Sequence, residues 1–280
     1  MARPDVYNRR MRDARRTLTA VARGAAPADR YLRGGTLLNV YTGEVYPANV
    51  AVRGERIAYV GPRDDMVGPA TDVLDVRGHV LVPGYIDPHV HPGHLVTPSA
   101  LARHLLPLGT TTVFADTLHF WELGGLAAFR AVADGLAGSP LKFYWMVRAH
   151  AQSRFTDEGR RFRLRDLERA LAHPWAAAVG EVTRWPEAWA GEPGLLRSLE
   201  AARVRGLRVE GHTAGAGVER IPGIAAAGFT SDHEPITAGQ VLARLARESG
   251  LDSGRALLGR HREVAGLVRA EYRRVVGDGA

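Results

Sequence analysis

The chain carries Pro83-Gly84-Tyr85-Ile86-Asp87-Pro88-His89-Val90-His91, in which two histidines close a short apolar run. Side chains alternate between the two faces of a strand, so His89 and His91 project to the same side. Two imidazoles that converge at the end of a strand are well placed to share a metal ion. The stretch is therefore expected to end the first strand of the main fold, with further ligands at the ends of later strands.

Strand-like runs recur after this stretch, with helical segments between them. Helices are expected from Pro98, with Thr97 as the N-cap, and over Leu195–Val204. This alternation favours a parallel α/β fold. A closed (βα)8 barrel needs eight strand–helix units, and the strand signal ends after Gln240, so the pattern predicts an incomplete TIM-type barrel of about six βα units. The expected strands are Tyr85–Val90, Thr111–Asp116, Lys142–Arg148, Ala177–Val182, Arg208–His212 and Phe229–His233.

The rest of the chain divides into three further segments by its patterns. Residues 1–30 form an N-terminal helical segment, because apolar residues recur at helical spacing over 5–23. Short strand-like runs with turn residues between them predict a small β-sandwich-like domain over residues 31–82. The partial barrel then covers residues 83–245, and residues 246–280 are expected to be an atypical helical tail.

Composition narrows the classes of function. The net charge of +7 comes almost wholly from arginine, since Lys142 is the only lysine, and the arginines are scattered without an accompanying aromatic motif. A nucleic-acid partner is therefore not expected. The sequence also lacks an apolar run of membrane-spanning length and an N-terminal signal core, so no membrane partner and a cytoplasmic location are expected. The absence of cysteine excludes thiolate metal sites.

Polar residues close the expected strands one after another. After His89 and His91 come Glu181, His212 and His233. In a parallel barrel these positions share one mouth, where functional side chains gather. Any one of these histidines alone would be read as structural, but their joint placement predicts a metal site. The only lysine opens a strand and cannot supply a carboxylated bridge at that mouth, so Glu181 is expected to bridge two ions.

Several motifs together resemble the adenine deaminase family of the metal-dependent amidohydrolase superfamily. They cover about residues 24–245 and include residues 83–91, Leu106-Pro107-Leu108-Gly109-Thr110-Thr111-Thr112-Val113, Gly180-Glu181, Gly211-His212 and Ser231-Asp232-His233-Glu234. The resemblance implies hydrolytic deamination of adenine to hypoxanthine and ammonia, a step of purine metabolism. It implies a binuclear centre of Mn²⁺, with Fe or Zn as alternatives. The implied metal ligands are His89, His91, Glu181, His212 and His233, and the expected catalytic residues are Glu181, His233 and Glu234.

Two departures from the family pattern bear on activity. The second expected strand ends at Asp116, which is followed by Thr117-Leu118-His119-Phe120, where family members commonly have Pro-His-Glu. The sequence also lacks an eighth strand with a terminal catalytic Asp, as in a C-terminally truncated member. Activity is therefore expected to be impaired. A different cyclic amide or amidine substrate and a non-catalytic metal-binding remnant stay open as alternatives. The expected partner is a purine or related heterocycle, and homo-oligomer formation is left open.

Overall fold

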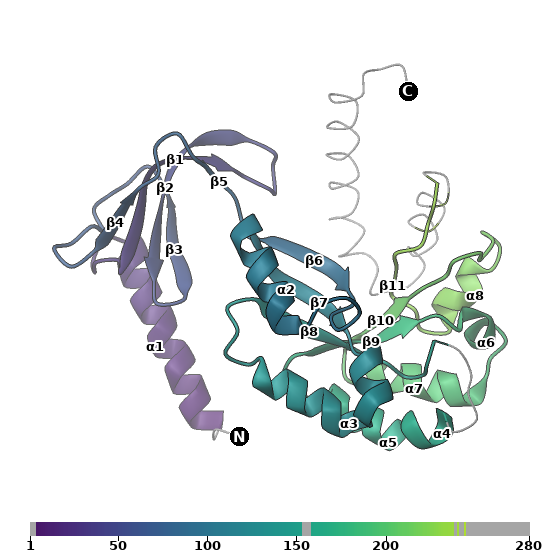
Figure 1. Cartoon of the computed structure of the whole chain (residues 1–280). Coiled ribbons are helices and arrows are strands. Elements are labelled where there is room, and N and C mark those ends of the chain that lie inside the picture. Colours follow the sequence, from purple (N-terminus) through teal and green to yellow (C-terminus); the bar gives the residue numbers. More distant parts are fainter. Residues whose placement is uncertain (1–3, 153–157, 238–239, 241–243, 245–280) are drawn as a thin grey trace, which may run out of the picture. The chain divides into compact units, whose positions relative to one another are not determined.

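The computed structural model describes residues 4–152, 158–237, 240 and 244, and the expected tail over 246–280 lies outside them. The chain forms two compact units, Met1–Pro83 and Gly84–Ala280. Figure 1 shows the elements of each unit. Among the described residues, no helix has both the length and the apolar character needed to cross a bilayer.

The first unit is a mixed sheet with one long helix. Helix α1 (Pro4–Ala22) precedes β1 (Arg30–Leu38), β2 (Val45–Arg53), β3 (Arg56–Gly61), β4 (Asp72–Asp75) and β5 (Val80–Leu81). The strand order is β3-β2-β1-β4, and β5 also pairs with β1. The described strands thus form a single sheet, which corrects the expected sandwich-like arrangement. The buried cluster of Val21, Ala28, Tyr31, Ala51 and Met66 takes the place of a second sheet, because α1 supplies Val21 to it.

The second unit contains the six strands expected from the sequence. They are β6 (Tyr85–Val90), β7 (Thr110–Asp116), β8 (Lys142–Val147), β9 (Ala176–Val182), β10 (Arg208–Gly211) and β11 (Ser231–Asp232). The sheet order is β11-β10-β9-β8-β7-β6, and every neighbouring pair is parallel. This open parallel sheet confirms the expected incomplete barrel. Parallel strands in sequential order place all their carboxyl ends at one edge.

Helices alternate with these strands (Figure 1). They are α2 (Pro98–Leu105), the 3-10 turn η1 (Leu106–Leu108), α3 (Leu118–Gly135), α4 (Glu158–Arg161), α5 (Leu164–Leu171), α6 (Trp185–Trp189), α7 (Pro193–Arg203) and α8 (Ile221–Ala226). The core of the unit joins strand residues such as Val113, Trp145 and Val179 to helix residues such as Phe129 and Leu199. Burial of this apolar surface holds the strands in register.

Local capping explains where two of the helices begin. The Thr97 hydroxyl accepts a hydrogen bond from the backbone N–H of Ala100, with Pro98 at the first helical position, as the sequence predicts. Helix α7 begins at Pro193, two residues before the expected start. The Glu192 carboxylate accepts hydrogen bonds from the backbone N–H groups of Gly194 and Leu195, which caps the helix there.

Candidate metal centre

The five residues expected to bind metal lie at the carboxyl edge of the second sheet. His89 lies near the end of β6 and His91 directly follows it, while Glu181 is the penultimate residue of β9. His212 follows β10 and His233 follows β11. The structure therefore brings all five side chains to one place, although they span 145 positions of the chain, from residue 89 to residue 233. Whether they bind an ion stays a prediction.

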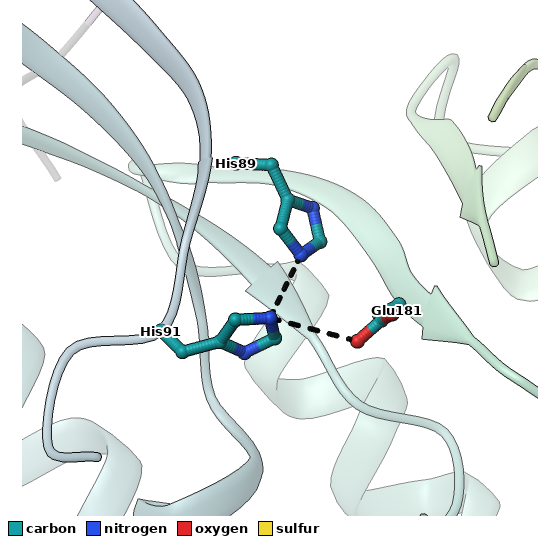
Figure 2. Close-up of side chains that lie close together, drawn as sticks. All are labelled: His89, His91 and Glu181. Carbon is teal, nitrogen blue, oxygen red and sulfur yellow. Dashed lines mark hydrogen bonds and ion pairs between the residues drawn. The ribbon is translucent and has the colours of Figure 1, made fainter. Parts of the chain in front are cut away.

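The first part of the cluster joins β6 to β9 (Figure 2). The Nε2 atoms of His89 and His91 are 3.0 Å apart, and His91 Nε2 lies 3.8 Å from Oε2 of Glu181. Each of these three residues offers one ligand atom, and the three atoms lie within 4.8 Å of one another. A single ion could therefore contact all three.

The second part uses the other oxygen of the same carboxylate. Oε1 of Glu181 lies 3.4 Å from Nε2 of His233 and is in close contact with Nδ1 of His212. These three residues also place ligand atoms within 4.8 Å of one another. Glu181 thus lies between two sets of imidazoles and presents one oxygen to each, which is the arrangement expected of a bridging ligand.

A second carboxylate that was not predicted from the sequence, Glu210, belongs to the cluster. Its Oε1 atom lies 2.8 Å from Nδ1 of His233 and 3.9 Å from Nδ1 of His89. Glu210 and His212 are two residues apart at the end of β10, so strand alternation places them on the same face. The same periodicity that pairs His89 with His91 could have identified Glu210.

Glu234, the third expected catalytic residue, also reaches the cluster. Its Oε1 atom lies 3.4 Å from Nδ1 of His212 and 3.5 Å from Nε2 of His233. Its side chain keeps 32% of its exposure, whereas that of Glu181 keeps 4%. Glu234 is therefore the more solvent-accessible carboxylate of the pair.

A buried ion-pair network holds the carboxylate of Glu181. The guanidinium of Arg148 donates to Asp116 Oδ2 at 2.6 Å and to Glu181 Oε2 at 2.6 Å. The side chains of Arg148 and Asp116 are both 1% exposed. The two carboxylates and the guanidinium therefore satisfy one another away from water, where an unpaired charge would be costly.

The surroundings set the protonation of the cluster. Burial, reinforced by His233 and His91, lowers the pKa of His89 to about 3, so its imidazole is neutral at pH 7. Burial alone would lower the pKa of His233, but hydrogen bonds to Glu181 and Glu210 outweigh it and raise that pKa to about 10. Burial alone would raise the pKa of Glu181, but His233 and Arg148 lower it to about 2.

The residues present fit one or two divalent ions. Among the described residues, the Nδ1 atoms of His89 and His212 are buried without a hydrogen-bond partner, as expected of ring nitrogens that coordinate an ion. The Nδ1 of His233 faces Glu210 and its Nε2 faces Glu181. A carboxylate on the far nitrogen is the usual support of a metal-binding histidine. Imidazole and carboxylate donors suit Zn, Mn or Fe.

Two other polar residues near the strand ends lie apart from the cluster's contacts. His119 faces His94, with ring nitrogens 3.4 Å apart. His150 is buried, its Nδ1 faces the backbone oxygen of Ala151, and burial lowers its pKa to about 4. Within the described part of the chain, neither histidine contacts Glu181 or the four clustered imidazoles, so the candidate site does not include them.

Comparison with known proteins supports the expected resemblance. The chain is 35% identical over 241 residues to an adenine deaminase of Moorella thermoacetica, covering 85% of this chain and 40% of that protein. It is 37% identical to an adenine deaminase of Rubrobacter xylanophilus, covering 82% and 39%. The chain thus spans about 40% of the length of these relatives. No family model matches it.

Solved structures share the fold. An N-acyl-D-glutamate deacylase of Bordetella bronchiseptica, complexed with zinc, is 20% identical with a TM-score of 0.54, covering 82% of this chain and 56% of that one. An N-isopropylammelide isopropylaminohydrolase of Burkholderia multivorans is 20% identical with a TM-score of 0.52, covering 80% and 66%. At this identity the likeness shows the fold alone.

Proposed function

We propose that this chain, which is related in sequence to the adenine deaminases of the amidohydrolase superfamily, carries the metal-binding part of a hydrolase that converts adenine and water to hypoxanthine and ammonia. One observation carries the proposal. Four imidazoles and the shared carboxylate of Glu181 converge at the carboxyl edge of a parallel sheet, in two sets that each fit one ion. The related adenine deaminases supply the substrate class.

The proposed cofactor is a pair of divalent ions, with Mn²⁺ as the first candidate and Fe or Zn as alternatives. His89 and His91 would hold one ion, His212 and His233 the other, and Glu181 would contact both. When bound, such ions supply Lewis acidity and lower the pKa of water toward 7. The absence of thiolates agrees with these metals.

The reaction adds water to the ring carbon that bears the exocyclic amine, and the bond from that carbon to the amine nitrogen then breaks. A proton must leave the water and another must reach the departing amine, which leaves as ammonia. Glu234 is placed for this transfer, because its Oε1 lies 3.4–3.5 Å from the imidazoles of His212 and His233 and remains partly exposed. His233 would keep the neighbouring carboxylate of Glu181 oriented.

We propose that turnover is slow in this chain. The superfamily resemblance calls for a catalytic aspartate at the end of an eighth strand, a position outside the six described strands, and the described Asp116 and Asp232 pair with Arg148 and Arg244. Among the described residues, neither of these two aspartates is therefore available to carry a proton. Of the described carboxylates at the site, the partly exposed Glu234 is then the candidate for this transfer, and general acid–base transfer is worth roughly 10²–10⁴-fold in rate.

Ammonia release from adenine by the purified, Mn²⁺-loaded chain tests the proposal. We expect release above the background of a Glu181→Ala variant, together with hypoxanthine in equal amount. Ammonia release from another cyclic amidine but not from adenine would show that adenine is not the substrate. Tight metal retention without release from any of these compounds would instead favour a non-catalytic metal-binding protein.

A further inference from the structure

Arg148 is a buried cation beside the candidate metal centre, and the deamination chemistry gives it no part. It directly follows β8, and its side chain is 1% exposed. Its Nη2 atom donates to Oε2 of Glu181 at 2.6 Å, and its Nε atom donates to Oδ2 of Asp116 at 2.6 Å. The guanidinium therefore contacts the very oxygen that faces His91.

The position of this guanidinium does not depend on the Glu181 carboxylate alone. Nη1 donates to the backbone oxygen of Glu181 at 2.8 Å and to Oε1 of Gln152 at 3.2 Å. The backbone N–H of Arg148 donates to the hydroxyl of Thr117, which itself donates to the backbone oxygen of Met146. The planar guanidinium of Arg148 is held in one orientation, because it donates hydrogen bonds to several fixed acceptors. We expect it to stay in place when the carboxylate binds an ion.

The two carboxylate oxygens of Glu181 therefore have different neighbours. Oε1 faces His212 and His233. Oε2 faces His91 at 3.8 Å but also accepts from Arg148. An ion held by His89 and His91 would share Oε2 with a fixed positive charge, whereas an ion held by His212 and His233 would use Oε1. Because Oε2 already accepts a hydrogen bond from the guanidinium, it has less negative charge to offer an ion than Oε1, and this difference counts for more in a buried site than in water.

We propose that Arg148 is a positioning residue that holds Oε2 of Glu181, turns Oε1 toward His212 and His233, and makes the two ion positions unequal. The position at His212 and His233 binds tightly. The position at His89 and His91 binds at least about tenfold more weakly, the lower end of what groups that orient a ligand contribute. This inference rests on the metal centre of the proposed function but not on its substrate.

Equilibrium dialysis of the metal-free full-length chain against Zn²⁺, with the bound metal counted by elemental analysis, tests the inference. We expect two binding steps, separated by about tenfold or more in dissociation constant. Two steps of equal affinity would overturn the role of Arg148 and leave the metal centre intact. No specific Zn²⁺ binding would overturn the metal centre and this inference together.

Variants assign the two steps. Arg148→Gln removes the cation and leaves in place Asp116, whose Oδ2 lies 3.8 Å from Nδ1 of His91. In this variant the ratio of the two dissociation constants should fall toward one, and the visible absorption of bound Co²⁺ should change. An unchanged ratio in a folded Arg148→Gln variant would contradict the proposal. A role limited to folding stability would leave both the ratio and the spectrum unchanged.

Histidine variants provide a second measurement that keeps Arg148 in place. His91→Asn should abolish the weak step and retain the tight one. His212→Asn should abolish the tight step. The opposite pattern would overturn the inference even if the Arg148→Gln variant did not fold. His104→Asn, at an exposed histidine of α2, is the matched control and should leave both steps unchanged.

Discussion

Nδ1 of His233 lies 2.8 Å from Oε1 of Glu210, so the opposite ring nitrogen is left to face Glu181. Carboxylates in this position orient a metal-binding imidazole and increase its basicity, and their loss typically costs about 10–100-fold in metal affinity. Glu210→Ala should therefore weaken Zn²⁺ binding by that factor, measured by dialysis. Glu210→Gln keeps an acceptor oxygen and should lose less. Equal losses in the two variants would argue against an orienting role.

Glu181 is the residue that the two candidate ion positions have in common. Glu181→Gln should weaken both binding steps by more than about 100-fold, since even groups that only orient a ligand are worth 10–100-fold. The matched control is Glu200→Gln on α7, which removes an exposed carboxylate paired with Arg203 and should change neither step. A Glu181→Gln variant that kept one step at its original affinity would show that the carboxylate does not bridge.

The pH dependence of stability follows from opposite pKa shifts of two histidines. Both have ordinary pKa values of 6.5, but that of His89 is lowered to about 3 and that of His233 is raised to about 10. A lowered pKa contributes stability that is present above 6.5 and lost as the pH falls toward 3. A raised pKa contributes stability that is present below 6.5 and lost as the pH rises through 10.

The metal-free protein should accordingly be most stable near pH 6.5. Thermal unfolding in the presence of a chelator, followed from pH 4 to 10, measures this. Glu181 adds to the acid side, because its pKa is lowered from 4.5 to about 2. His233→Gln should flatten the alkaline side, and His89→Gln should flatten the acid side. An unfolding temperature that kept rising up to pH 9 would contradict the assigned pKa of His233.

Much of the second unit could be predicted from the sequence because its signals are local. Strand β6 has the expected bounds, Tyr85–Val90, since an apolar run between turn residues marks both ends. The Thr97 cap and the strand-end histidines depend on neighbours close in the chain. Topology then brings the histidines together without any further information, because parallel strands in sequential order share one edge.

The remaining features depend on contacts between distant residues. Arg148 meets Asp116 and Glu181 across 32 and 33 positions of the chain, and nothing in its local sequence separates this role from a surface ion pair. In the first unit, the strand pattern could not distinguish two facing sheets from one sheet packed by a helix. The sheet is packed by the helix, because Val21 of α1 lies in the same buried cluster as Tyr31 of β1. Glu210 is different, since its alternation with His212 was available in the sequence.

The close packing of β9 against β10 gives a last prediction, because it sets the spacing of the cluster. A Cβ added at Gly180 would lie 2.7 Å from Cβ and 3.0 Å from the backbone oxygen of Glu210. Gly180→Ala must therefore push the strands apart, which should cost about 1–3 kcal/mol of unfolding free energy and displace Glu181 from His212.

The control is Gly135→Ala in α3, where a Cβ meets nothing within 4 Å. That change should be neutral or stabilising by about 0.5–1 kcal/mol. Urea unfolding and Zn²⁺ dialysis of both variants measure the effects, and a Gly180→Ala protein as stable and as tightly metal-binding as the control would show that this contact does not set the spacing of the site.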